Sequence, residues 1–502
     1  MLAAMQAATI AQPAAPAAPP PRRLDDLPGP RGLPLVGNLL QIDPARMHLQ
    51  LEAWSREFGP YFTLRLGTGR FLVVADHVAV SQALRDRPEG FQRTTRLENV
   101  AKEMGLKPGL FGANGDDWKR QRRMVMAGFD PAHVKAYFPS LQNVAERLGR
   151  RWQAAARADQ AIDLQADLMR YTVDTIAGLA FGAEVNTLES EGHVIQQHLD
   201  KIFPALLKRV MAPLPLWRVL KMPADRRLER GVAAVNEAVA GFIAEARARM
   251  QADPGLRTHP RNLLEAMIAA ADQPDSGISD LQVAGNVMTM LLAGEDTTAN
   301  TIAWMIDLLW RNPAALARAI DEVQRVVGDD PRPDFEQVGR LDYIEACAHE
   351  TMRLKPVAPL IGLQAIRDGL VGDVQVPAGT VIMNLMRPDS VSDSHLPNAS
   401  GFEPERWLSS DAALGAMAGS ARRISMPFGA GPRICPGRYL ALLEMKMAMA
   451  TLLGRFEIAA IDTPDGKPAR ELLSFTMTPV GLRMRLRERA ASAAGSPTLS
   501  SE

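Results

Sequence analysis

One cysteine of this chain lies in a segment suited to holding a metal-binding thiolate. Cys435 belongs to the run FGAGPRICPG at 428–437, where glycine and proline surround it. Glycine has no Cβ, so backbone N–H groups can approach the sulfur closely. Pro436 stands where a helix can begin, and the partial positive charge of a helix N-terminus favours thiolate over thiol. The segment predicts a metal ligand, with a buried structural cysteine as the alternative.

A long apolar helix is predicted between Ser279 and Asn312. Ser279 begins a capping box, Pro313 supplies a stop, and about thirty residues between them would span about 45 Å. The stretch is apolar on most faces, so it should pass through the centre of the protein. Its middle reads AGEDTT at 293–298. Buried carboxylates must be paired, hydrated or functional, so this segment is a candidate site unless it is a helix end.

A third cluster pairs an acid with a base. Glu350 and Arg353 are three residues apart on one helix face, where they can form an ion pair. Arg406 could complete a buried triad with them, although spacing alone does not show that they meet. His349 and Glu350 begin like a zinc-protease helix, but Arg353 stands where the second histidine is required. The glycines at 429–431 lack the third glycine of a dinucleotide fingerprint, and no phosphate-binding Gly-Lys-Ser/Thr loop occurs.

The pattern of elements favours a mainly α protein with small β-sheets. Short β-type runs are predicted at 61–66, 71–74, 369–384 and 473–486, on either side of a helical region at 118–325. No internal repeat or composition break divides the chain. We therefore expect a flexible Ala/Pro-rich leader at 1–26, a single domain at 27–487 and a disordered tail at 488–502.

Composition excludes several classes of protein. The 502 residues include 57 Lys and Arg and 57 Asp and Glu, which gives no basic surplus for nucleic-acid binding. With two cysteines there is no disulfide framework, and a reducing cytoplasm is expected. Cys347 has no motif partner and is expected to be a small buried side chain. No apolar run reaches the roughly 20 residues of a membrane span, so we expect a soluble protein.

Together and in this order, these clusters resemble the haem-thiolate monooxygenases, the cytochromes P450. The cysteine segment is similar to that family's Phe-x-x-Gly-x-Arg-x-Cys-x-Gly, and 293–298 to its oxygen-activating helix motif. Glu350 and Arg353 match its Glu-x-x-Arg pair, and 118–122 its Trp-x-x-x-Arg helix. The resemblance spans about 27–486. It implies the P450 fold, a triangular helical mass with haem b between the long central helix and the helix of the cysteine loop.

The resemblance also implies roles for particular residues. Cys435 would be the axial iron ligand, whose electron-rich sulfur favours O–O cleavage. Asp296 and Thr297 would supply protons on the opposite face of the haem. Glu350, Arg353 and Arg406 would form a structural triad. The haem itself would be held by six further residues, several of them on its propionates: Trp118, Arg122, Phe428, Gly431, Arg433 and Gly437. The propionate cation that many relatives place near 361–364 is absent here.

Substrate and partners follow from the same resemblance. The substrate contacts would be mainly apolar, which indicates a lipophilic molecule: Met290, Ala293, Val357, Ile361 and Met477. We expect O2 as co-substrate and electrons from NAD(P)H through a separate ferredoxin or flavodoxin, since no reductase segment follows the last strand. A basic docking surface could use five cations, with a solvated charged face as the alternative: Lys119, Arg120, Arg123, Arg438 and Lys446. We expect a monomeric, cytoplasmic enzyme of bacterial origin. A peroxide-using relative and a non-catalytic haem sensor are the alternatives.

Overall fold

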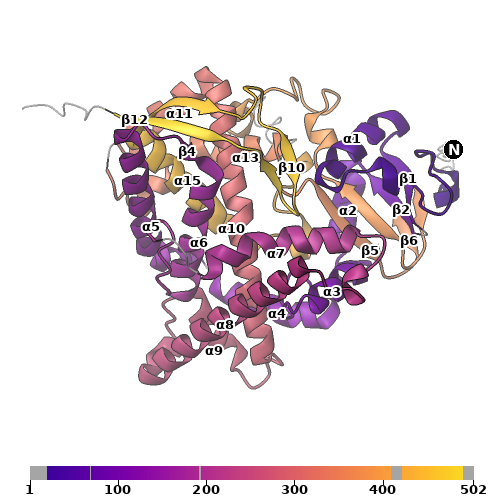
Figure 1. The fold of residues 1–502 in the computed structure, drawn as a ribbon, viewed down its shortest axis with the longest axis horizontal. Coiled ribbons are helices and arrows are strands. Elements are labelled where there is room, and N and C mark those ends of the chain that lie inside the picture. The colour runs from indigo at the N-terminus through magenta and orange to yellow at the C-terminus, as the bar shows by residue number, and fades with distance from the viewer. Residues whose placement is uncertain are drawn as a thin grey trace, which may run out of the picture.

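Helices build most of the molecule, and a smaller β-rich part lies at one side (Figure 1). The computed structural model describes residues 20–67, 69–129, 131–190, 194–328, 330–408 and 421–489. The α-helices are α1 (Met47–Phe58), α2 (His77–Arg85), α3 (Thr95–Glu103), α4 (Gly115–Gly128), α5 (Pro131–Arg157), α6 (Leu164–Phe181), α7 (Val194–Met211), α8 (Pro223–Ala252), α9 (Leu263–Ala271), α10 (Asp280–Arg311), α11 (Pro313–Val326), α12 (Phe335–Gly339), α13 (Asp342–Leu354) and α15 (Arg438–Arg455). The 3-10 turns are η1 (Leu24–Asp26), η2 (Leu39–Gln41), η3 (Pro44–Arg46), η4 (Leu216–Arg218), η5 (Pro254–Arg257), η6 (Pro388–Val391), η7 (Pro404–Trp407) and η8 (Gly431–Arg433).

Four small sheets flank the helices. The strands are β1 (Tyr61–Leu66), β2 (Gly69–Val74), β3 (Phe91–Gln92), β4 (Ile162–Asp163), β5 (Leu360–Ala365), β6 (Gly369–Val371), β7 (Val374–Val376), β8 (Val381–Leu385), β9 (Phe456–Asp462), β10 (Glu471–Leu473), β11 (Met477–Pro479) and β12 (Arg483–Glu488). A five-stranded sheet has the order β1-β2-β8-β5-β3, in which β2 and β8 are parallel and the other pairs antiparallel. A three-stranded sheet, β4-β12-β9, and the hairpins β6-β7 and β10-β11 complete the set. The predicted fold class is confirmed.

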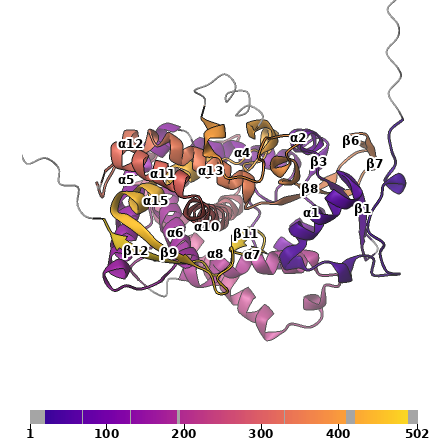
Figure 2. The ribbon, with the colours of Figure 1, turned by 90° about the horizontal axis from the view of Figure 1, so that it is seen from above.

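Helix α10 runs through the centre of the molecule, where Figure 2 shows it nearly end-on. Ser279 and Gln282 form the predicted capping box, in which each side chain bonds the other residue's backbone N–H. Asn312 ends the helix before Pro313. Most of its residues are buried, as expected for a helix that is apolar on most faces.

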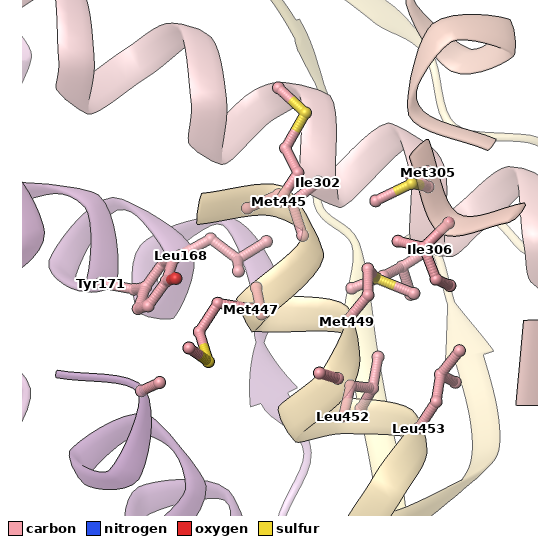
Figure 3. Packing of buried hydrophobic residues seen from close by; sticks show 14 of the residues in the cluster. Leu168, Tyr171, Ile302, Met305, Ile306, Met445, Met447, Met449, Leu452 and Leu453 are labelled. Atoms are coloured by element: carbon pink, nitrogen blue, oxygen red, sulfur yellow. The ribbon is translucent and has the colours of Figure 1, made fainter. Parts of the chain in front are cut away.

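The largest core packs α15 against α10 and α5, and side chains of α6 join the same cluster (Figure 3). Met445, Met447 and Met449 of α15 are almost fully buried there, against residues such as Ile302 and Tyr171. Unbranched methionine side chains fill irregular gaps between crossing helices. This packing fixes the helix that follows the cysteine segment relative to the central helix.

A buried ion-pair network joins early and late parts of the chain. Arg387, just after β8, donates to Glu52 of α1 at 2.7 Å and to Glu471 of β10 at 2.8 Å. All three side chains are less than a tenth exposed. His48 and Lys355 bond the same Glu471 carboxylate, so its charge is fully compensated.

The ends of the domain differ in part from the sequence prediction. Residues 20–26, assigned to the leader, are folded: Arg22 pairs with Val374 of β7 and its guanidinium bonds Asp373. Glu488, assigned to the tail, ends β12. The remainder of the predicted leader and tail, 1–19 and 490–502, lies outside the described residues. Among the helices that are described, none has an apolar stretch long enough to cross a bilayer.

Candidate active site

Tight backbone turns hold the cysteine segment against α2. Gly429 and Gly431 both have positive φ, +75° and +70°, a conformation that L side chains rarely adopt. A Cβ on Gly431 would lie 2.6 Å from the Cα of Arg85, so only glycine permits this approach. The backbone N–H of Cys435 donates to the Phe428 carbonyl at 2.9 Å. These contacts fix the position of the sulfur before any ligand binds.

The sulfur of Cys435 is largely shielded from solvent and has cations on one side. Burial raises the pKa of the Cys435 thiol, while the Gly437 N–H, Arg122 and Arg438 act in the opposite direction. A metal ion deprotonates a thiol that coordinates it, so these groups would stabilise the resulting thiolate. Helix α15 begins at Arg438, with Gly437 as its N-cap. The prediction that it begins at Pro436 was wrong by two residues, because Pro436 lies in the turn before it.

Four arginines cluster near the cysteine segment without a carboxylate partner. Burial lowers the pKa of Arg93 to about 10, and burial together with neighbouring arginines lowers that of Arg433 and Arg87 to about 9. Burial also lowers the pKa of Arg122. Within the described part of the chain, none of the four forms an ion pair with Asp or Glu. Buried charges are costly unless compensated, so this cluster is suited to an anion.

Two of these arginines lie over aromatic rings. Arg433 donates to the Ala113 carbonyl, and its guanidinium lies 4.9 Å from the centre of the Trp118 ring. Arg93 lies over Phe111, and its Nε is buried with no hydrogen-bond partner in the described structure. Such an orphaned donor indicates a missing acceptor. The sequence predicted Trp118, Arg122 and Arg433 here and missed the other two cations.

Arg87 and Arg93 carried no motif signal. Arg93 follows β3, whose Gln92 pairs with Gln364 of β5, the strand where the expected further cation was absent. The neighbouring strand thus supplies a cation at this edge of the sheet. Sequence spacing could not show that β3 and β5 are adjacent, because they are more than 260 residues apart.

The predicted acid–hydroxyl pair lies in the middle of α10. Thr297 donates back to the Ala293 carbonyl at 2.7 Å. The Asp296 carboxylate accepts from Thr476 at 2.6 Å and from Asn300 at 3.3 Å. Burial raises its pKa, and these two hydrogen bonds oppose the shift. A carboxyl group with a raised pKa, held by hydrogen bonds beside the Thr297 hydroxyl in sequence, is suited to take up and pass on a proton.

Two further acids lie close to this pair. Glu295 is almost fully buried, and burial raises its pKa well above the usual range, with Asp296 and Asp200 adding to the shift. Burial also raises the pKa of Asp200, on α7. Ala293 is exposed although Leu292 and Glu295 are buried, so this turn of α10 borders accessible space inside the helical mass. The sequence placed Glu295 in the motif but assigned it no partner.

The structure brings the predicted triad together. Arg353 forms a two-fold hydrogen-bonded pair with Glu350, at 2.8 and 2.7 Å, and Arg406 donates to the same carboxylate at 3.1 Å. Trp407 and the backbone N–H of Glu403 satisfy the carboxylate further, at 2.8 and 2.9 Å. All three triad side chains are at most 1% exposed. The cluster ties α13 to η7.

The five predicted substrate contacts differ in how far their side chains are exposed. Ala293 is exposed and Ile361 half-buried, while Met290 and Val357 are each 9% exposed. Met477 has no exposed surface, and its backbone bonds Val357. The accessible side chain near it is that of Phe475.

An aromatic group was missed. Phe475 has φ of +95°, an uncommon backbone conformation for a bulky residue, and its ring stacks on Phe203 at 4.3 Å. The centre of the Phe111 ring lies 5.8 Å from that of Phe475. The three rings come from the β10–β11 turn, α7 and the loop before α4, so the sequence contained no local signal that they meet.

Comparison with known proteins agrees with this geometry. The family model for cytochrome P450 matches residues 27–486. The chain belongs to the cytochrome P450 family. It is 29% identical over 451 residues to cyclooctat-9-en-7-ol 5-monooxygenase of Streptomyces melanosporofaciens, covering 89% of this chain and 93% of that protein. It is 27% identical over 460 residues to the carotene epsilon-monooxygenase of Arabidopsis thaliana, covering 88% and 82% respectively.

Two other relatives bear on architecture. A self-sufficient cytochrome P450 monooxygenase of Penicillium expansum is 27% identical over 92% of this chain, which spans 43% of that longer protein. The crystal structure of the cytochrome P450DA haem domain superposes with a TM-score of 0.78 at 24% identity, covering 94% of this chain and 98% of that one. That likeness shows the P450 fold. Members of the family carry haem with a cysteine thiolate ligand.

The residues of this chain fit such a cofactor. Haem carries two propionates, and the four uncompensated arginines with the orphaned Arg93 Nε form a site for anionic groups. The sulfur of Cys435 has an N–H donor from Gly437. The enzyme is therefore a cytochrome P450 monooxygenase.

Proposed function

We propose that the protein uses O2 and a haem held by Cys435 to insert one oxygen atom into a lipophilic substrate. The observation that carries this proposal is the Asp296–Thr297 pair on the central helix, beside the accessible surface at Ala293. In the reaction, two electrons and two protons accompany O2, one oxygen atom enters the substrate, and the other leaves as water. Hydroxylation and epoxidation both fit this balance.

Different residues of the chain would bind the haem and deliver protons. Bound haem supplies the iron at which O2 is activated. Cys435 would hold the iron, and the Gly437 N–H would tune the electron density on the sulfur. Trp118 and the arginines at 93, 122 and 433 would bind the propionates. The Thr297 hydroxyl would deliver protons, and Asp296, fixed by Thr476, would replace them from water.

An apolar, aromatic-walled region supports a lipophilic substrate. Phe475, Phe203 and Phe111 form one group, and Ala293 and Ile361 add apolar accessible surface. The names of two relatives give cyclooctat-9-en-7-ol and carotene as their substrates, and both are largely apolar molecules. We propose a substrate of this general class.

Electrons would come from NAD(P)H through a separate ferredoxin or flavodoxin, docking near the cysteine segment. Arg438 and Arg123 are exposed there and are the residues proposed for this surface. Lys119 and Arg120 already pair with acids, at 3.5 and 3.3 Å. Lys446 does not belong to the surface: its side chain is 7% exposed and bonds Glu345 and the Gly339 carbonyl. The prediction for Lys446 was wrong because α15 turns that face inward.

Two alternatives are less well supported. Peroxide-using relatives tend to replace the acid–threonine pair, which is intact here. A haem sensor would have no need of a proton relay. The intact Asp296–Thr297 pair disfavours both.

The test uses the wild type and three variants, each supplied with haem. The reduced, carbon-monoxide-bound wild type should absorb near about 450 nm, and Cys435→Ala should lose that band. Thr297→Ala should keep the band and the haem but consume NAD(P)H and O2 with little oxygenated product from an apolar test substrate. Thr289→Ala, on the same helix, is the matched control. Coupled product formation by Thr297→Ala at the wild-type rate would contradict the proton role.

A further inference from the structure

Two histidines and an aspartate meet at the N-terminal end of α2, opposite the end that packs on the cysteine segment. His77 is the first residue of α2, Asp389 lies in η6, and His395 follows that turn. One ligand atom from each lies within 4.8 Å of the others. The side chains are 14%, 20% and 34% exposed, so the group is held by the fold but open to solvent.

The Asp389 carboxylate is the centre of the group. One oxygen accepts from both the backbone N–H and the Nδ1 of His77, each at 2.8 Å. The other lies 3.4 Å from the Nε2 of His395. Of the residues that the structure describes, no Lys or Arg pairs with this carboxylate. Imidazole differs from those cations because its nitrogen can offer a lone pair to a metal.

The distances fit a small coordination sphere. Zinc binds imidazole nitrogen and carboxylate oxygen at about 2.0–2.2 Å, so neighbouring ligand atoms in a tetrahedral site lie about 3.3 Å apart. The observed nitrogen–oxygen separations lie on either side of that value, at 2.8 Å from His77 Nδ1 to one Asp389 oxygen and 3.4 Å from His395 Nε2 to the other. The imidazole rings meet edge to face, with centroids 5.0 Å apart, so their nitrogens converge without stacking.

We propose that His77, Asp389 and His395 form a binding site for a divalent transition metal of the zinc class. Two imidazoles and one carboxylate leave a fourth position for water. Magnesium and calcium prefer sets of oxygen ligands and do not suit this group. Coordination needs a lone pair on His77 Nδ1, so the proton of its hydrogen bond to Asp389 moves to the other nitrogen of that ring or to water.

The site joins two segments that support the haem side of the molecule. The other end of α2 packs on Gly431 of the cysteine segment. Next to Asp389, Ser390 accepts through its carbonyl from Arg353 of the buried triad. A bound ion would therefore clamp α2 to the segment that follows β8. Because the metal binds only the folded form, it should raise the thermal unfolding temperature.

The test uses haem-loaded protein, in which the Cys435 sulfur is occupied, and zinc as the probe. Equilibrium dialysis with elemental analysis should find one zinc bound per chain in the wild type, and zinc should raise the unfolding temperature. In His395→Ala the affinity should fall by at least about 10- to 100-fold. His395 is the most exposed of the three, so its loss is the least disturbing to folding.

Controls separate this site from general zinc binding. His259→Ala removes an exposed histidine that bonds Thr258 elsewhere on the surface and should bind zinc as the wild type does. Asp389→Asn should weaken binding as His395→Ala does. Wild-type affinity in His395→Ala, no zinc bound by the wild type, or equal competition by calcium would each overturn the proposal. None of these readings depends on monooxygenase activity.

Discussion

Replacing Arg93 with methionine should change the stability of the haem-free and haem-loaded proteins in opposite directions. Burial lowers the pKa of Arg93 from 12.5 to about 10, which corresponds to about 3 kcal/mol against its charged form, at about 1.4 kcal/mol per pKa unit. Its contact over the Phe111 ring, at 4.3 Å, offsets about 1 kcal/mol of that cost. Arg93→Met should therefore raise the free energy of unfolding of the haem-free protein by about 2 kcal/mol.

With haem bound, the same change would remove the charge-assisted hydrogen bond that we propose between Arg93 and a propionate. Such a bond contributes about 1.5–3 kcal/mol, so haem should be lost about 10- to 100-fold more readily. Urea unfolding of the haem-free protein and haem transfer to an excess of scavenger protein measure the two effects. Lys119→Met, a loss of an exposed and already paired cation, should change neither. Equal destabilisation of both forms by Arg93→Met would refute an anion-binding role.

Three further changes test the framework around the site. Glu350→Gln leaves two buried guanidinium groups short of charge and should cost about 3–5 kcal/mol in urea unfolding; a loss below about 1 kcal/mol would show the triad to be dispensable. Hydrogen bonds from His48 and Arg387 outweigh burial and hold the pKa of Glu471 well below 4.5, so the wild type should lose stability as the pH falls below about 4.5. Glu471→Gln should be less stable than the wild type at pH 7, and its free energy of unfolding should depend less on pH below about 4.5. An unchanged pH dependence in the variant would contradict the role of Glu471. Gly431→Ala, whose Cβ would collide with α2, should lower the unfolding temperature and haem content more than Gly429→Ala, which has the same sign of φ but open space; equal effects would rule out the collision.

Local sequence signals predicted the elements that carry the site. The cap at Ser279 and the stop at Asn312 gave α10 its bounds, and Glu350 and Arg353 share a helix face because they are three residues apart. Each of these features depends on neighbours within a few residues. The strand at 61–66 was predicted for the same reason and forms as β1.

Features assembled from distant segments could not be predicted. Arg93 and Arg433 influence each other across 340 positions, and the stacked rings of Phe203 and Phe475 come from opposite halves of the chain. Their proximity is set by tertiary packing, which leaves no periodic trace in the sequence. Lys446 shows the converse error, because a charged residue on a helix after the cysteine segment was assumed to face solvent.

The network at Arg387 has a consequence for synthesis of the chain. Its first partner, Glu52, leaves the ribosome 335 residues before it, and its second, Glu471, follows 84 residues after it. Until Glu471 emerges, the guanidinium can satisfy only part of its hydrogen-bonding capacity, and the N-terminal helix has only a partial anchor. The nascent chain therefore cannot close this junction early, and its final compaction waits for the β10–β11 segment that also carries Phe475.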